Sequence, residues 1–153
     1  GYLATEALIQ ASHSEIACLL SKGNRTSGFF QGYRQCLLEH NISLNEQFVF
    51  SIADGLPISK MANHLFSGIV VSHYSAAVQL FQAVNTLHYS IPYDFSLISL
   101  KDTERLIQDY PPISTLTIPH FEFSRHLAHK LIQTIEKKEE IYIRRMDPKL
   151  LKN

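Results

Sequence analysis

Residues 16–39 read IACLLSKGNRTSGFFQGYRQCLLE and carry the clearest fold signal in the chain. The first five residues are all apolar, which is typical of a strand buried on both faces of a parallel sheet. A polar loop with two glycines follows at 21–28. Phe30, Tyr33 and Leu37 then recur at the spacing of one helical face. The stretch therefore predicts a strand, a loop and a helix in succession.

The same alternation of apolar runs and amphipathic stretches continues on both sides of this unit. Helices are predicted at 3–11, 29–39, 58–66, 77–87, 102–109 and 123–135, and strands at 16–20, 48–52, 68–72, 95–100, 114–118 and 141–143. This order predicts an α/β fold with a three-layer αβα architecture, in which helices cover both faces of a mainly parallel sheet through right-handed crossovers. The chain opens on a helix and not on a strand, so we expect it to be part of a larger fold.

Ligands of such sheets bind beyond the carboxyl ends of the strands. Here those ends are 21–28, 53–57, 72–75 and 101–103. An enzyme would need a nucleophile and a base, or two carboxylates, together at this edge. Asp54 and His73 lie there, but nothing in the sequence ties them together.

Composition and charge restrict the class of protein to which this chain can belong. The chain has 153 residues, a mass of 17.5 kDa and a hydrophobic content of 45%, which is enough for one domain with a packed core. Its 14 basic and 14 acidic side chains give no net charge. A dedicated nucleic-acid binder normally has a basic excess, so we expect these residues alone to bind DNA poorly.

The sequence predicts neither a membrane span nor a secretion signal. No apolar run approaches ~18 residues, and residues 1–6 lack the basic and apolar parts of a signal peptide. Cys18 and Cys36 both have apolar neighbours, which is typical of buried free thiols and not of a disulfide framework. We therefore expect a cytoplasmic protein that does not bind membranes.

Common catalytic and nucleotide-binding motifs are absent from the sequence. Loop 23–28 has the glycines of a phosphate-binding loop, but two phenylalanines follow where such a loop needs Lys and Ser or Thr. Glu122, His126 and His129 share one side of a predicted helix and are the candidate metal ligands. That side faces away from the apolar stripe of the helix. We therefore interpret these three residues as a solvated face and expect no metal and no cofactor.

Five short motifs, in order, resemble the lactose-repressor/galactose-repressor (LacI/GalR) family of bacterial transcription regulators. The matching stretches are LIQASHSEIA at 8–17, FFQGYRQCL at 29–37, SHYSA at 72–76, IPYDFSLISLK at 91–101 and PPISTLTIP at 111–119. The family pattern for the first stretch is Leu-Ile-x-x-Gly-His-x-x-Ile-Ala. Each motif is weak by itself, but together the five cover nearly the whole chain.

The resemblance implies the second half of a ligand-binding core with the fold of type I periplasmic sugar-binding proteins. Residues 1–119 would then form most of the second, C-terminal lobe. Residues 120–153 would contain a hinge crossover, a helix of the first lobe and a returning tail. In the family, a DNA-reading helix-turn-helix and the first lobe precede this region.

The function that the resemblance implies is effector sensing and dimerisation in a transcription regulator, a repressor of sugar or carbohydrate genes. An effector between the lobes would favour one lobe arrangement and change the spacing of two DNA-reading heads in a homodimer. DNA would be bound only through the helix-turn-helix, and no reaction would be catalysed. Two alternatives stay open: a solute-binding protein for sugar transport, and a small α/β enzyme.

In the family, an arginine and two aspartates commonly hold a sugar or a purine through planar, bidentate hydrogen bonds. The positions that match them here are Phe29, His73 and Lys101. Phe29 can stack on a ligand but cannot hydrogen-bond to it, while His73 and Lys101 replace two negative charges. The resemblance therefore places an effector site at these residues, with its usual contacts altered.

Three interpretations of this altered site stay open. Lys101 and Arg25, with His73 as an additional contact, could hold an anionic effector such as a sugar phosphate. Arg25 and Thr26 belong to a loop at the same sheet edge. In the second interpretation, Phe29 merely fills a pocket that has lost its small-molecule role. In the third interpretation, Asp102 takes the place of the lost aspartate, displaced by one residue.

Overall fold

The computed structural model describes residues 1–21, 24–101, 113–118, 120–137 and 148–151. Six strands form one sheet in the order β2-β1-β3-β4-β5-β6. They are β1 (Ile16–Leu20), β2 (Val49–Ser51), β3 (Gly68–Val71), β4 (Ser96–Lys101), β5 (Ser114–Thr117) and β6 (Lys149–Leu151). The neighbours from β2 to β5 are parallel, and β6 is antiparallel to β5. The predicted mainly parallel sheet is therefore confirmed.

Helices cover both faces of the sheet. The helices are α1 (Tyr2–Gln10) and α2 (Gly28–Glu39) on one face, and α3 (Ile58–Ala62) and α4 (Tyr74–Thr86) on the other. The side chains of β1 alternate between the two apolar clusters that result. Ala17 and Leu19 belong to the cluster under α3 and α4. Ile16, Cys18 and Leu20 belong to the cluster under α1 and α2, so β1 is buried on both faces, as its apolar run predicts.

The predicted helix at 58–66 is shorter in the structure, where α3 ends at Ala62. The chain leaves the helix because His64 adopts a left-handed backbone conformation with a φ of 50°. Phe66 is buried nonetheless, in the connection to β3, whereas Leu65 is exposed. The apolar spacing over residues 58–66 thus arises because Phe66 is buried in the connection, and not because the helix continues to it.

One further prediction differs in extent from the structure. The predicted strand at 48–52 is reduced to β2, because a 3-10 turn flanks it on each side, at Glu46–Phe48 and Ile52–Asp54. The predicted helix at 102–109 and strand at 141–143 lie outside the described residues. The short strand β6 is not predicted from the sequence.

Helices α1 to α4 all end in the same hydrogen-bonded turn, and none of them uses glycine for it. The residue after each helix cap is left-handed: Ser12 (φ 69°), Asn41 (φ 57°), His64 (φ 50°) and His88 (φ 61°). In each turn, the N–H of the left-handed residue and the N–H of the residue after it donate to carbonyls of the last helical turn. This is the Schellman motif, whose left-handed position is usually glycine because other residues meet a steric penalty there.

Ser12 lies where the LacI/GalR pattern has glycine, so Ser12→Gly should stabilise the protein. The substitution keeps the bonds from Ser12 N–H to Ile9 O (2.9 Å) and from His13 N–H to Leu8 O (3.0 Å). The substitution removes the steric cost of a left-handed serine, and the greater freedom of glycine in the unfolded chain partly offsets this gain. The net increase in the free energy of unfolding is roughly 0.5–1 kcal/mol. We expect the thermal unfolding midpoint to rise by about 2 °C. Ser12→Ala is the control, and an equal midpoint for both variants would contradict this account.

His13 follows this turn and joins α1 to the amino ends of β3 and β4. Its Nδ1 lies 2.7 Å from Ser67 Oγ and its Nε2 lies 2.8 Å from Ser96 Oγ, so both ring nitrogens have hydrogen-bond partners. Burial lowers the pKa of His13 below its ordinary 6.5, because the charged ring is less well solvated there. The neutral ring is therefore the form that the fold favours.

This depressed pKa predicts that the protein loses stability as the pH falls below 6.5. In that range the unfolded His13 binds a proton and the folded ring does not, so the free energy of unfolding decreases toward acid. Urea midpoints measured between about pH 7.5 and pH 5 should fall less in His13→Gln than in the wild type. His126→Gln, which changes an exposed histidine, is the matched control and should keep the wild-type slope. If the urea midpoint of His13→Gln falls with pH as steeply as that of the wild type, the prediction is contradicted.

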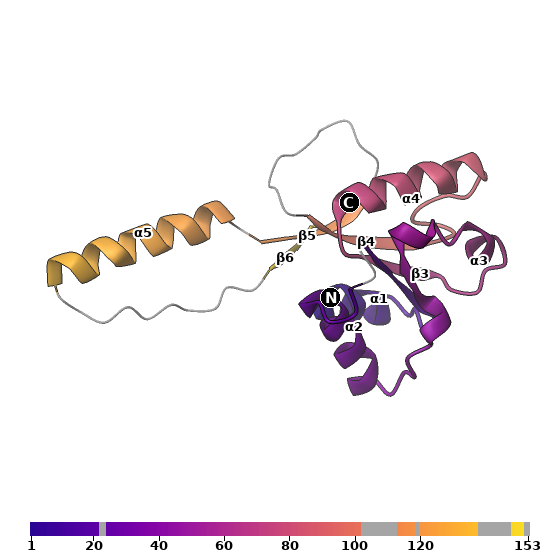
Figure 1. Cartoon of the computed structure of the whole chain (residues 1–153), viewed down its shortest axis with the longest axis horizontal. Coiled ribbons are helices and arrows are strands. Elements are labelled where there is room, and N and C mark those ends of the chain that lie inside the picture. The colour runs from indigo at the N-terminus through magenta and orange to yellow at the C-terminus, as the bar shows by residue number, and fades with distance from the viewer. Residues whose placement is uncertain (22–23, 102–112, 119, 138–147, 152–153) are drawn as a thin grey trace.

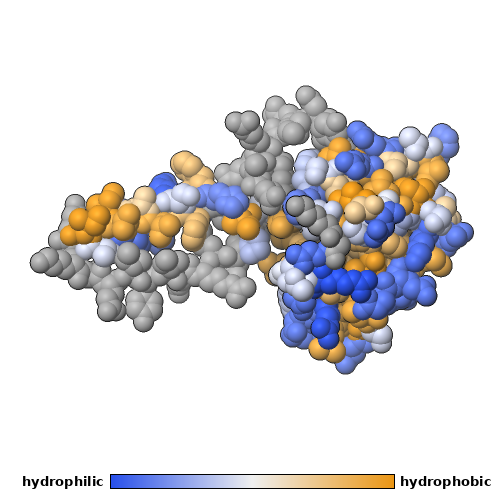
Figure 2. All heavy atoms as spheres, in the orientation of Figure 1, coloured by the Kyte–Doolittle hydropathy of each residue, from blue (hydrophilic) through white to orange (hydrophobic). Residues whose placement is uncertain are grey.

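The helix α5 (His120–Lys137) projects away from the sheet and its covering helices, and it contributes to neither apolar cluster (Figure 1). Five of its large apolar side chains are 37–71% exposed and form what we call the α5 stripe: Phe121, Leu127, Leu131, Ile132 and Ile135. Apolar surface extends along this helix in Figure 2. An amphipathic helix normally buries its apolar face, so we expect another surface to cover the α5 stripe. Within the described ranges, no helix is long and apolar enough to cross a bilayer.

Candidate functional site

A cavity of about 210 Å³ opens at the carboxyl ends of β1, β3 and β4. Its walls come from these strand ends, from the loop after β1 and from the starts of α2 and α4: Leu20, Ser21, Asn24, Ser27, Phe29, Ser72, His73 and Leu100. This is the edge of the sheet at which parallel α/β folds bind ligands. We refer to it as the edge cavity.

Local turn chemistry holds the loop after β1 beside the edge cavity. Asn24 Oδ1 accepts hydrogen bonds from the Thr26 N–H at 3.0 Å and from the Thr26 hydroxyl at 2.6 Å. Ser27 Oγ then caps α2 by accepting from the Phe30 N–H at 3.3 Å. The helix therefore begins at a fixed place, and Phe29 enters the cavity wall from its first turn.

Two helices begin at the edge cavity. Ser27 is the N-cap of α2 and His73 is the N-cap of α4, and both residues line the cavity. The positive ends of both helix dipoles therefore favour electronegative ligand atoms there. The Ser21 N–H donates to Ser72 Oγ at 3.0 Å, and that oxygen lies 3.2 Å from His73 Nδ1. His73 makes no side-chain cap bond to α4 and is exposed, which leaves its ring accessible to a ligand.

The structure brings together two of the three residues that the resemblance aligns with the family's ligand contacts. Phe29 and His73 both line the edge cavity. Lys101 is the last residue of β4 and follows Leu100, which is part of the lining. The side chain of Lys101 and the whole of Asp102 lie outside the described part of the chain.

The two loop candidates are engaged elsewhere. Arg25 forms an ion pair with Glu46, with both side chains exposed, and it does not line the edge cavity. The Thr26 hydroxyl is used in the turn with Asn24. The polar lining that sequence reasoning missed consists of Ser21, Asn24, Ser27 and Ser72. All four lie in or beside the predicted strand-end segments, which is the signal that could have identified them.

The structure gives no support to the candidate metal set. In the part of the chain that the structure describes, no three His, Cys, Asp or Glu side chains gather as a metal site. Glu122, His126 and His129 are exposed on α5. The candidate catalytic pair is also separated, because Asp54 follows β2 and His73 follows β3, and β1 lies between these strands.

Both cysteines are buried free thiols, as the sequence predicts. Burial raises the pKa of Cys18 to about 12 and that of Cys36 to about 11. Thiols that stay protonated are poor nucleophiles. Neither cysteine therefore supports the enzyme alternative.

The sequence matches the family of periplasmic binding protein-like domains over residues 5–151. A probable HTH-type transcriptional regulator, EndR of Paenibacillus polymyxa, is 31% identical over 147 residues, which are 88% of this chain and 43% of that protein. The ribose operon repressor of Haemophilus influenzae is 30% identical over 151 residues, 93% of this chain and 46% of that protein. The chain thus spans about half the length of the curated relatives that it matches.

Solved structures of transcription regulators share the fold. The Escherichia coli transcriptional repressor ascG superimposes with a TM-score of 0.80 at 24% identity, over 99% of this chain and 58% of that one. A sugar-binding transcriptional regulator of the LacI family from Escherichia coli, complexed with phosphate, gives a TM-score of 0.77 at 23% identity, over 97% of this chain and 58% of that one. At these identities the likeness shows the fold alone.

Proposed function

Because this chain belongs to the family of periplasmic binding protein-like domains, we propose that it is the second lobe of the effector-binding core of a DNA-binding transcription regulator. The resemblance to the LacI/GalR family is confirmed by the relatives, which are regulators and repressors. The observation that carries the proposal is the edge cavity at the carboxyl ends of the strands, whose lining includes both Phe29 and His73.

In this proposal, residues 1–119 form most of the second lobe, and residues 120–153 cross a hinge, give α5 to the first lobe and return. The exposed α5 stripe supports this division, because a first lobe would supply the apolar surface that such a helix needs. The pairing of β6 with β5 supports the return of the tail to the second lobe. The edge cavity then forms one wall of a cleft between two lobes.

The proposed output is a shift between lobe arrangements, and no reaction is catalysed. An effector that contacts both walls of the cleft favours the closed arrangement by the difference in its affinity for the two states. In a cytoplasmic homodimer, that shift changes the distance between two helix-turn-helix heads that lie outside these residues. DNA affinity and effector affinity are then linked, and each changes the other by the same factor.

We propose a sugar or a sugar phosphate as the effector. The ring of Phe29 offers a flat apolar face on which a sugar ring can stack, and the serine, asparagine and histidine groups of the lining offer hydrogen bonds. The ion pair with Glu46 argues against Arg25 as the anion contact. A phosphate group would therefore rely on Lys101 and on the starts of α2 and α4, while a neutral sugar would need only the polar lining.

Binding of the full-length protein to genomic DNA fragments tests the proposal. Fluorescence anisotropy at fixed salt should show one class of fragments bound more tightly than unrelated DNA by at least about 1000-fold. One member of a panel of monosaccharides and sugar phosphates should change that affinity. Equal binding to all DNA, or an affinity that no panel member changes, would contradict the proposed function.

A further inference from the structure

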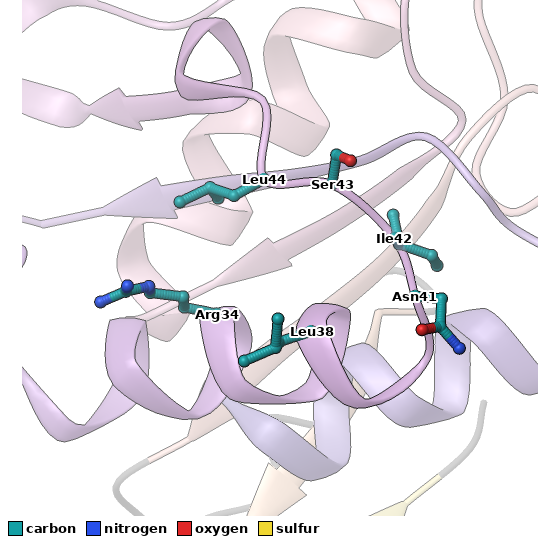
Figure 3. Close-up of a pocket in the computed structure, with 6 residues that line it drawn as sticks. All are labelled: Arg34, Leu38, Asn41, Ile42, Ser43 and Leu44. Atoms are coloured by element: carbon teal, nitrogen blue, oxygen red, sulfur yellow. The ribbon is translucent and has the colours of Figure 1, made fainter.

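A second cavity lies on the outer side of α2, toward the end of this helix (Figure 3). It has a volume of about 410 Å³ and is lined by Arg34, Leu38, Asn41, Ile42, Ser43 and Leu44. This volume is within the range of small-molecule sites. Leu38 follows Phe29 by about 14 Å along the helix axis. We call this cavity the α2 groove. It shares no lining residue with the edge cavity.

The wall of the α2 groove opposite the helix is held by the Schellman turn that ends α2. The left-handed Asn41 donates its N–H to Leu38 O at 3.1 Å, and the Ile42 N–H donates to Leu37 O at 2.9 Å. The chain thereby reverses and runs back alongside the helix (Figure 3). Ile42 and Leu44 pack against the cluster under α1 and α2, so this wall is anchored in the core.

Leu38 gives the groove an apolar surface that the core does not use. The residues that α2 buries are Phe30, Tyr33, Cys36 and Leu37. Leu38 is instead 69% exposed, whereas the neighbouring Leu37 is 2% exposed. Figure 3 shows its side chain directed from the helix toward the returning loop. An apolar ligand placed there would remove this side chain from water.

Arg34 gives the same groove an uncommitted positive charge. It lies one turn before Leu38 and therefore on the same side of α2. Among the described residues it forms no ion pair, whereas Arg25 is paired with Glu46. No acidic side chain lines the groove, and Asn41 and Ser43 supply polar groups at its rim. The groove thus combines one free guanidinium with an apolar wall.

We propose that the α2 groove binds a small organic anion with an apolar body, namely an aryl or alkyl carboxylate. The planar guanidinium of Arg34 matches a carboxylate through two parallel hydrogen bonds. The side chains of Leu38, Ile42 and Leu44 cover the apolar body. This site is separate from the edge cavity, and it does not rest on the function proposed for that cavity.

Saturation-transfer NMR on the full-length protein with 4-phenylbutyrate tests this site. The acid should bind saturably, and 4-phenylbutanamide, its neutral analogue, should bind at least about tenfold more weakly. Arg34→Gln should weaken binding of the acid by a similar factor, and Leu38→Asn should weaken it several-fold. Arg125→Gln, which changes an exposed arginine of α5, is the matched control and should bind the acid as the wild type does.

Three outcomes would overturn the proposal. One is wild-type affinity for 4-phenylbutyrate in Arg34→Gln, which would place the binding elsewhere. Another is equal affinity for the acid and the amide, because the charge would then play no part. The third is the absence of saturable binding up to the solubility limit of the acid. Arg34 and Leu38 are exposed, so unchanged thermal midpoints should show that both variants are folded.

Discussion

Gly32→Ala is expected to lower the thermal unfolding midpoint by about 6–12 °C, which corresponds to a loss of roughly 3 kcal/mol. A Cβ at Gly32 would lie 2.6 Å from the backbone nitrogen of Tyr2 and 3.4 Å from the carbonyl carbon of Gly1. Because both atoms are backbone, α1 must move away from α2 to admit the methyl group. Movement of α1 would also disturb Ala4 and Leu8, which are buried in the shared cluster.

The sign of this effect separates close packing from helix propensity. Where there is room, alanine is better than glycine inside a helix by up to about 1 kcal/mol. Gly28→Ala is the matched control, since it lies in the same helix and its Cβ would meet no atom within 4 Å. Differential scanning calorimetry should show a midpoint that is unchanged or raised in Gly28→Ala. A raised midpoint in Gly32→Ala would show that α1 and α2 do not pack as described.

Leu131→Asp in the full-length protein is expected to abolish stable folding of the core, because the α5 stripe is proposed to pack into the first lobe. Burial of an unpaired carboxylate in an apolar interface costs several kcal/mol, which is a large part of the stability of a typical domain. We therefore expect the variant to lose its cooperative unfolding transition. Leu131 is 48% exposed in the structure, so these residues alone provide no reason for such a loss.

His126→Asp is the matched control for this prediction. His126 is exposed on the polar side of α5, so the same carboxylate should change the free energy of unfolding by less than about 0.5 kcal/mol. Urea unfolding followed by circular dichroism measures both variants. If Leu131→Asp is as stable as His126→Asp, then α5 is not covered by a first lobe, and the proposed division at residue 119 is wrong.

The strands could be predicted well because burial on both faces leaves little choice of side chain. Residues 16–20 are predicted and observed as one strand, and the parallel order follows from the helices between the strands. Helix ends were harder to place, because all four Schellman turns use Ser, Asn or His in the left-handed position. Without glycine as a marker, the apolar spacing around Phe66 extended the predicted α3 too far.

The place of the candidate site could be predicted, but its chemistry could be predicted only in part. The resemblance aligned Phe29 and His73, and the structure finds both in one cavity. The ion pair of Arg25 depends on Glu46, which lies far along the chain, in the turn before β2. The roles of Asn24 and Ser27 follow from hydrogen bonds within a single loop, and the composition of that loop does not specify them.

Isothermal titration of the full-length protein with monosaccharides and sugar phosphates tests most directly whether the edge cavity is the effector site. His73→Trp should fill the cavity from its exposed rim, while Gln82→Trp places the same ring on an exposed position of α4, away from the lining. We predict that one member of the panel binds the wild type and Gln82→Trp saturably, and that His73→Trp abolishes this binding. Wild-type affinity in His73→Trp, or no saturable heat from any member of the panel, would contradict the account.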